Sequence, residues 1–177
     1  MGVVAGIVPW NYPSFVFARK IAPALLAGDT IILRPGCETS NNAHEFSKII
    51  IESELPNGVA NVIFGFGREI GNSLVKNKQI DFVTFTGSIE AGQEIMRNAA
   101  TNVAKVSLEL GGKAPAVVMD EANLEEAVTY VIKSRVVNAG QICNDVERVY
   151  VHERGKEKFE NLLKNRFERI KIGNPLD

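Results

Sequence analysis

The sequence predicts an α/β protein that is built on a parallel sheet with helices on both faces and is followed by the start of a second α/β domain. Short apolar runs alternate with longer segments whose apolar residues recur at helical spacing. Glycine or proline ends most of these segments. Such alternation is typical of parallel sheets, because each crossover helix packs on a face of the sheet.

The expected strands of the first part are short apolar runs, most of them stopped by a proline or a glycine turn. Pro9 stops the first run, and residues 82–86 carry the β-branched and aromatic side chains that strands favour. In chain order, these strands are expected at 3–8, 30–33, 61–64, 82–86 and 106–110.

Helices are expected between these strands, where apolar residues recur every three or four positions. Gly28 suits the C-terminal end of the first helix, and Ser40 is expected to be the N-cap of the second. In chain order, these helices are expected at 13–27, 40–54, 68–75 and 89–100.

The character of the chain changes after Gly111 and Gly112, where we expect a domain boundary. Strands are expected at 116–119 and 148–151, and helices at 124–137 and 156–170. The 65 residues from Lys113 onward are few for an independent hydrophobic core, so they are expected to open a larger domain.

Composition and charge exclude several classes of protein. Lys plus Arg is 20 and Asp plus Glu is 21, so the net charge of −1 favours neither nucleic acid nor a membrane surface as a partner. No apolar run approaches the roughly 18 residues of a membrane span. Cys37 and Cys143 are too few for a disulfide framework and favour a reducing, cytoplasmic location. No His/Cys cluster has metal-ligand spacing, so no metal is expected.

Two glycine-containing turns are candidates for binding a phosphate. Residues 65–71 read Gly-Phe-Gly-Arg-Glu-Ile-Gly, and the third glycine falls one residue late for the dinucleotide fingerprint, which favours a plain tight turn. Gly87 and Ser88 lie between a strand and a helix N-terminus, where backbone amides and the helix dipole suit a phosphate. No lysine follows Gly92, so this turn is not a Walker P-loop.

Cys143 and Glu109 each have a structural and a chemical interpretation. A single cysteine is more often a small buried hydrophobe, but Cys143 follows the break at Gly140 and has polar neighbours. Glu109 is an acid in an otherwise apolar strand. It is either a salt-bridged core residue or a carboxylate with a raised pKa that suits general-base chemistry.

Four motifs that occur in order closely resemble the aldehyde dehydrogenase superfamily. They are Val-Pro-Trp-Asn-Tyr-Pro at 8–13, Phe-Thr-Gly-Ser at 85–88, Glu-Leu-Gly-Gly-Lys at 109–113 and Gly-Gln-Ile-Cys at 140–143. Asn144 and residues 147–151 look most like the members that act on lactaldehyde, glycolaldehyde and glyceraldehyde.

The resemblance implies a Rossmann-like cofactor-binding domain over residues 1–112 and the beginning of a catalytic domain over 113–177. Both are expected to be incomplete, so the chain is expected to be the middle of a longer family chain. The parent is expected to be a homo-oligomer. The alternative to an active enzyme is a truncated, non-catalytic nucleotide-binding fragment.

The resemblance also implies the oxidation of a small aldehyde to its carboxylic acid. Cys143 is the implied nucleophile, which forms a thiohemiacetal and then a thioester. Asn11 would stabilise the oxyanion, and Glu109 would activate the water that hydrolyses the thioester. Relatives that pass the acyl group to coenzyme A generally lack this glutamate, which favours acid-forming chemistry.

A nicotinamide dinucleotide is the implied cofactor. Ser88 and the helix N-terminus that follows it are expected at the pyrophosphate. The residues expected to contact the cofactor are Val8, Pro9, Trp10, Arg34, Gly65, Gly87, Ser88 and Leu110.

The sequence departs from the family pattern near the adenosine ribose. Many members read Lys-Pro-Ser-Glu where residues 34–37 read Arg-Pro-Gly-Cys, so Arg34 replaces the lysine and Cys37 replaces the glutamate that would bind the ribose hydroxyls. A carboxylate there repels a 2′-phosphate and an arginine attracts one, which favours NADP over NAD. Glu38 lies one place along and could reach the ribose after a register change.

Overall fold

The computed structural model describes residues 2–174 and 176, and its chain divides into two compact units. The first unit is Met1–Gly111 and the second is Gly112–Asp177. The expected boundary after Gly112 lies within one residue of this division, and the function assigned to each part stays a prediction.

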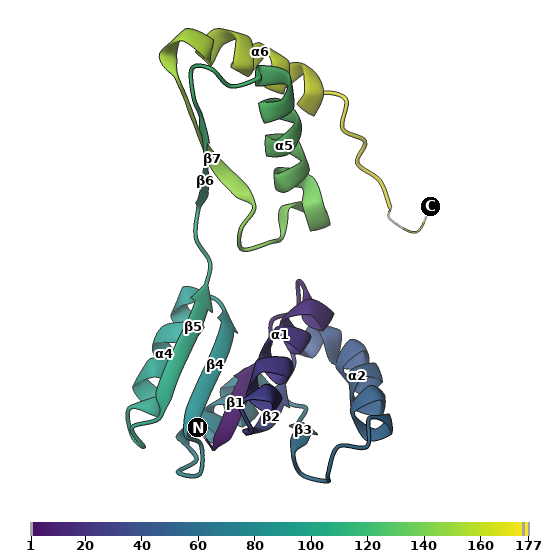
Figure 1. The fold of residues 1–177 in the computed structure, drawn as a ribbon, viewed down its shortest axis with the longest axis vertical. Coiled ribbons are helices and arrows are strands. Elements are labelled where there is room, and N and C mark those ends of the chain that lie inside the picture. The colour runs from purple at the N-terminus through teal and green to yellow at the C-terminus, as the bar shows by residue number, and fades with distance from the viewer. Residues whose placement is uncertain (1, 175, 177) are drawn as a thin grey trace. The chain divides into compact units, whose positions relative to one another are not determined.

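The first unit is built on a five-stranded parallel sheet with the order β3-β2-β1-β4-β5 (Figure 1). All four neighbouring pairs are parallel, so the carboxyl ends of the strands meet at one edge of the sheet. The strands are β1 (Val3–Ile7), β2 (Thr30–Arg34), β3 (Ala60–Val62), β4 (Phe82–Gly87) and β5 (Lys105–Leu110).

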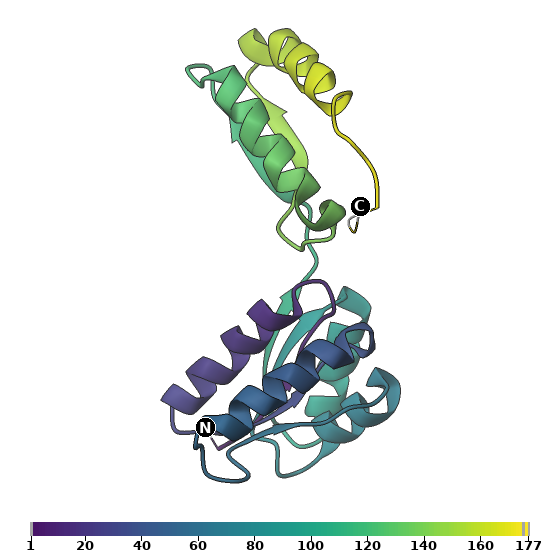
Figure 2. The ribbon, with the colours of Figure 1, turned by 90° about the vertical axis from the view of Figure 1, so that its right-hand side faces the viewer.

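Helices cover both faces of this sheet, as the sequence predicts. Helices α1 (Pro13–Leu26) and α2 (Ser40–Glu52) lie on one face (Figure 2). There, Phe17 and Ala43 belong to the same core cluster as Ile31 and Leu33. Helices α3 (Asn72–Lys76) and α4 (Ile89–Ala99) cover the other face, where the core holds Val75, Val83 and Ile95. The predicted α/β fold class is confirmed.

Local chemistry explains where the first helices begin and end. Pro13 opens α1, where its missing N–H costs no helical hydrogen bond. Gly28, just after this helix, has a φ of 77°, which favours glycine. The prediction that Ser40 caps α2 is wrong, because a 3₁₀ turn over Cys37–Thr39 precedes the helix and makes Thr39 its N-cap. The Ser40 hydroxyl instead donates to the Cys37 carbonyl over 2.9 Å.

The second unit is a two-stranded parallel sheet with two helices. Strands β6 (Ala114–Val118) and β7 (Val146–Val151) pair, and helices α5 (Leu124–Val136) and α6 (Lys156–Phe167) pack together. Val128 and Phe159 are fully buried in this core. The opposite face is bare: Val117 and Tyr150 pair across the strands and are 66% and 54% exposed.

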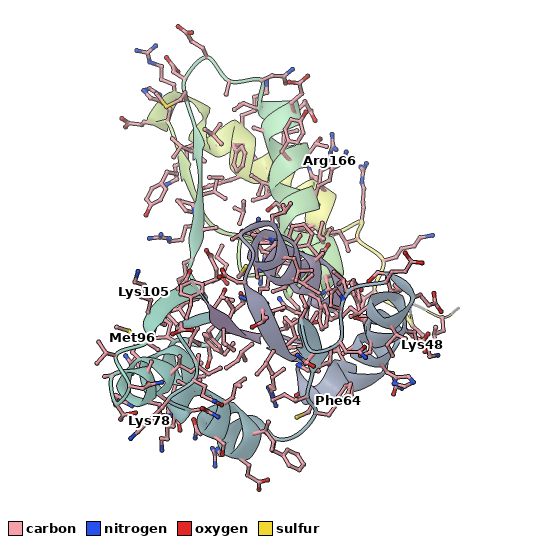
Figure 3. All side chains as sticks on the ribbon, turned by 60° about the horizontal axis from the view of Figure 1, so that its bottom comes forward. Lys48, Phe64, Lys78, Met96, Lys105 and Arg166 are labelled. Carbon is pink, nitrogen blue, oxygen red and sulfur yellow. The ribbon has the colours of Figure 1, made fainter. Side chains whose placement is uncertain are left out.

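The surface of the first unit carries charged and isolated apolar side chains. Lys48, Lys78 and Lys105 are exposed, and Lys48 pairs with Glu45 over 2.8 Å (Figure 3). Phe64 and Met96 are also exposed. Single exposed apolar residues are normal on a globular surface, so these residues define no site.

Candidate active site and cofactor cavity

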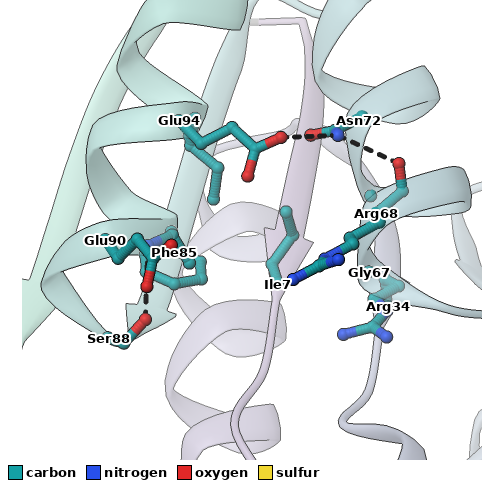
Figure 4. Close-up of a pocket in the computed structure, with 12 residues that line it drawn as sticks. Ile7, Arg34, Gly67, Arg68, Asn72, Phe85, Ser88, Glu90 and Glu94 are labelled. Atoms are coloured by element: carbon teal, nitrogen blue, oxygen red, sulfur yellow. Dashed lines mark hydrogen bonds between the residues drawn. The ribbon is translucent and has the colours of Figure 1, made fainter.

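A cavity of about 260 Å³ lies at the carboxyl edge of the parallel sheet. Ile7, Arg34 and Phe85, at or near the ends of β1, β2 and β4, line it (Figure 4). The remaining lining residues come from the π-helical turn η2 (Gly67–Gly71), the start of α3 and the first turns of α4; they are Gly67, Arg68, Gly71, Asn72, Ser88, Glu90, Ala91, Glu94 and Ile95.

The position of this cavity in the sheet favours ligand binding. The chain runs from β1 outward to β2 and β3, and then crosses back to β4 on the other side of β1. Ligands of open α/β sheets bind outside the carboxyl ends of the strands at such a switch point. The cavity volume is close to the lower end of small-ligand pockets, about 300 Å³, so it would hold one part of a dinucleotide.

The N-terminus of α4 borders the cavity and suits a phosphate. Ser88 is its N-cap, and the Ser88 hydroxyl oxygen accepts a hydrogen bond from the Ala91 N–H over 3.2 Å. The helix has 11 residues, so its dipole and remaining free amides point toward this end. Ser88 thus lies at a helix N-terminus, and its contact with a pyrophosphate stays a prediction.

Arg34 is held rigidly at the opposite side of the cavity. The side chain is only 8% exposed, and its Nε and Nη2 donate to the Gly65 carbonyl over 3.1 and 2.8 Å. Its Nη2 also donates to the Cys37 sulfur over 3.2 Å. Gly67 lies beside the guanidinium, and a Cβ there would be in ordinary van der Waals contact with Arg34 Nη2, at 3.5 Å.

Other residues expected at the cofactor lie near this edge but do not line the cavity. Val8 is buried after β1, Pro9 is half-buried and Trp10 is exposed beside Gly36. Gly65 acts on the cavity through Arg34. Gly87 ends β4, and Leu110 ends β5 with its side chain packed against the core near Gly92.

Of the residues that line the cavity, only Arg34 and Ser88 belong to the expected set, and four of the others have polar side chains: Arg68, Asn72, Glu90 and Glu94. The Asn72 side-chain amide donates to Glu94 over 2.7 Å and to the Arg68 backbone carbonyl over 2.9 Å. Residues 65–71 read as a plain turn by their glycine spacing. The sequence feature that could have indicated a binding role is Arg68, a basic residue inside a turn that precedes a helix.

Asn11 and Glu109 both lie at this same edge of the sheet. Asn11 lies between β1 and α1, and Glu109 is next to last in β5. One strand, β4, separates β1 from β5, which sets their axes about 10 Å apart. Glu109 is exposed on the edge strand, so the interpretation of a buried core residue is wrong. The physical reason is that its alternate neighbours Leu108 and Leu110 take the core-facing positions.

Lys20 is a buried cation on the same sheet face as Glu109. Its Nζ donates to the Thr84 hydroxyl over 2.9 Å. Thr84 pairs with Ser107 and Thr86 pairs with Glu109, so these side chains share the face that α1 covers in part. Burial lowers the pKa of Lys20 from 10.5 to about 8, although the Glu109 carboxylate acts in the opposite direction.

Cys143 belongs to the second unit and lies on an exposed, tightly turned loop. The residues before it, Asn138, Ala139 and Gly140, have φ values of 50°, 57° and 75°. Left-handed conformations at non-glycine residues are strained and cluster at functional sites. Asp145, 3% exposed, anchors the loop by accepting a hydrogen bond from the Ile142 N–H over 3.2 Å.

Residues 2–174 and 176, which the structure describes, contain neither a metal-binding cluster nor a membrane-spanning helix. There, no three His, Cys, Asp or Glu side chains are grouped so as to hold a metal ion. None of the described helices combines the length and the apolar character that crossing a bilayer requires.

The parallel sheet, its switch-point cavity and the capped helix beside it define a unit of the doubly wound α/β class. The aldehyde dehydrogenase family profile matches residues 1–177, and the chain belongs to this family.

Individual relatives agree with this assignment. The chain is 50% identical to the lactaldehyde dehydrogenase of Escherichia coli over its full length, and it spans 37% of that protein. The crystal structure of that enzyme matches 99% of this chain with a TM-score of 0.96. The NADP⁺-dependent D-glyceraldehyde dehydrogenase of Picrophilus torridus is 42% identical over 98% of this chain and 35% of its own length.

A solved structure shows the other cofactor. The betaine aldehyde dehydrogenase of Staphylococcus aureus in complex with NAD⁺ is 41% identical, with a TM-score of 0.94 over 98% of this chain and 34% of that one. Relatives of this chain therefore bind NAD or NADP.

Proposed function

We propose that this chain is part of an NAD(P)-dependent dehydrogenase that oxidises a small hydroxyaldehyde, such as lactaldehyde or glyceraldehyde, to its carboxylic acid. The observation that carries the proposal is the cavity at the carboxyl ends of β1, β2 and β4, with Asn11 and Glu109 at the same edge of the sheet. The relatives that act on lactaldehyde and D-glyceraldehyde support the substrate class.

The residues at the cavity fit a dinucleotide. Ser88 and the N-terminus of α4 offer amides to a pyrophosphate, and Arg34 supplies a fixed positive charge across the cavity. Cys37 in place of a carboxylate removes the group that would repel a 2′-phosphate. The proposed cofactor is therefore NADP in preference to NAD. When bound, its nicotinamide ring supplies the acceptor for the hydride of the aldehyde.

In the proposed chemistry Cys143 is the nucleophile. An ordinary thiol has a pKa of about 8.5, so the thiolate must be favoured in the site. Attack by the Cys143 sulfur on the aldehyde carbon produces a thiohemiacetal whose oxygen carries the developing negative charge. The Asn11 side-chain amide and the Cys143 backbone N–H would donate to that oxygen. Removing such a donor costs on the order of 10² to 10³ in rate.

Glu109 completes the proposed reaction after oxidation has produced a thioester on Cys143. Its carboxylate would take a proton from a water molecule, whose oxygen then adds to the thioester carbon. Collapse of that adduct releases the carboxylic acid and returns the Cys143 thiolate. Exposure of Glu109 at the edge of the sheet is compatible with water reaching it.

The proposal also includes the cellular compartment and the oligomeric state of the parent protein. The two cysteines of the chain are both free thiols, which supports a reducing, cytoplasmic compartment. The parent is proposed to be a homo-oligomer by family resemblance alone.

A second candidate is a chain that binds the cofactor without turnover. The observation that favours it is the separation of Cys143 from Asn11 and Glu109 in two compact units of a chain that spans 37% of a relative. Turnover requires that catalytic groups be held within a fraction of an ångström, whereas every residue that lines the cavity belongs to the first unit.

One experiment separates the two candidates. Reduction of NADP and NAD is followed with glyceraldehyde, lactaldehyde and glycolaldehyde, for the 177-residue chain and for Cys143→Ala, while calorimetry measures cofactor binding. Turnover that Cys143→Ala abolishes supports the dehydrogenase. Binding without turnover supports the second candidate. No binding of either cofactor contradicts both.

A further inference from the structure

The cavity contains two guanidinium groups that lack a carboxylate partner among the residues that the structure describes. Arg34 is buried, and its hydrogen bonds go to neutral acceptors, the Gly65 carbonyl and the Cys37 sulfur. Burying a charge without a counter-charge is costly, so such a group is usually paired. The surroundings of Arg34 therefore favour an anion that comes from outside the chain.

Arg68 lines the same cavity and is exposed. Its backbone is fixed in η2, where its carbonyl accepts from Asn72. Its guanidinium, by contrast, makes no hydrogen bond or ion pair with any of the described residues, and the residue is exposed. Figure 4 shows the side chain extending into the space between η2 and α4. An exposed arginine whose guanidinium donors are not used by the described residues suits bidentate binding of a phosphate.

The two walls of the cavity differ in the charge of their side chains. Ser88, Glu90 and Glu94 lie on the α4 wall, and Arg34 and Arg68 lie on the wall formed by β2 and η2 (Figure 4). The Glu94 carboxylate accepts from Asn72, at the other end of the cavity from Ser88 in this view. Glu90 belongs to the first turn of α4. The arginine wall is thus the side on which an anionic group is favoured.

The pyrophosphate of a dinucleotide is assigned to the N-terminus of α4, which leaves the two arginines for a second anionic group. NAD has no further phosphate, whereas NADP has one on the adenosine ribose. We propose that Arg68, together with Arg34, binds the 2′-phosphate of NADP, and that Arg68 determines the preference for NADP over NAD. This inference rests on the proposed function and adds to it the residue that selects the cofactor.

The test compares Arg68→Gln with the wild-type chain in calorimetric binding of NADP, NAD, 2′,5′-ADP and 5′-AMP. The last two ligands differ only in the 2′-phosphate. Arg97→Gln, an exposed arginine in the last turn of α4 and outside the cavity, is the matched control. Loss of a charge-assisted contact predicts that Arg68→Gln weakens NADP and 2′,5′-ADP by about 10- to 100-fold. NAD and 5′-AMP are expected to change less than about twofold, and Arg97→Gln to change none of the four.

Each other outcome overturns the proposal in a recognisable way. If Arg68→Gln weakens NADP and NAD equally, Arg68 contacts a part that both share. If it weakens neither, Arg68 does not contact the ligand. If the folded wild-type chain binds none of the four ligands, the proposed cofactor function fails and the role of Arg68 fails with it. Circular dichroism of each variant verifies that the chain is folded.

Discussion

Lys20 on α1 donates a hydrogen bond to Thr84 on β4 over 2.9 Å, and this contact fixes an almost fully buried ammonium group against the sheet. Gly6 lies beside this side chain: a Cβ at this position would be 3.6 Å from the Cδ of Lys20, an ordinary van der Waals contact, but only 2.8 Å from the Leu33 side chain. Burial lowers the pKa of Lys20 to about 8, the nearby Glu109 charge opposes that shift, and Arg19 adds to it.

This pKa predicts how stability depends on pH. Between about pH 8 and pH 10.5 the unfolded chain keeps a proton on Lys20 that the folded chain has lost, so the free energy of unfolding rises with pH in this window. Urea unfolding should show a rise of on the order of 2–3 kcal/mol for the wild type relative to Lys20→Met. The exposed Lys48→Met is the control and should follow the wild type. Parallel curves for Lys20→Met and the wild type would contradict the prediction.

Cys37→Glu is predicted to reverse the cofactor preference. A carboxylate at this position would be within reach of Arg34, whose Nη2 is now 3.2 Å from the Cys37 sulfur, and it would repel a 2′-phosphate. Calorimetry should show that NADP binding weakens by about tenfold or more and that NAD binding becomes tighter. Cys37→Ser, which adds no charge, should keep the wild-type ratio. An unchanged ratio in Cys37→Glu would show that this position does not face the ribose.

Gly65→Ala is predicted to destabilise the first unit by about 1–3 kcal/mol. Its φ of 148° is unfavourable for a side chain, and a Cβ there would overlap the side chain of Ile70. The Gly65 carbonyl that holds Arg34 would move with it. Gly58→Ala is the control, since Gly58 also has a positive φ, 87°, but has open space around its Cβ position. Urea unfolding should show the larger loss for Gly65→Ala, and equal losses would mean that the overlap is relieved.

Asp145→Ala is predicted to destabilise the second unit by about 1–3 kcal/mol, because it leaves the partly buried Ile142 N–H without its acceptor. Asp145→Asn, which keeps an oxygen acceptor, should cost less. The control is Asp120→Ala, which removes an exposed pair with Arg154 and should cost less than about 1 kcal/mol. Urea unfolding measures all three, and a smaller loss for Asp145→Ala than for Asp120→Ala would refute the anchoring role.

The sequence predicts most of this fold because its signals are local. Pro9, Gly28 and the apolar runs between them fix where β1, α1 and β2 begin and end to within one residue or so. Ser40 fails as an N-cap since a 3₁₀ turn already satisfies the chain before it, and that turn has no strong signature. The helices expected to end at 54 and 170 end at Glu52 and Phe167, where apolar periodicity alone gives no stop.

The candidate site was less accessible to sequence reasoning because it is assembled from distant segments. Ser88 has a local signature, a turn between a strand and a helix. Arg68 has no local sequence signature. It lines the cavity because β2, η2 and α4 meet there, and the spacing of glycines in the sequence does not predict that these three segments meet. Glu109 alternates with the core-facing Leu108 and Leu110, and the sequence shows that pattern, but which helices cover the two faces of β5 is decided by the strand order, which the sequence does not show.

The bare face of the second unit affects how the chain behaves in solution. Parallel sheets normally have both faces covered, yet β6 and β7 have helices on one side and expose Val117 and Tyr150 on the other. An apolar surface of this kind attracts other apolar surfaces. The 177-residue chain is therefore expected to self-associate at high concentration, and Val117→Lys should raise its solubility without disturbing the core around Phe159.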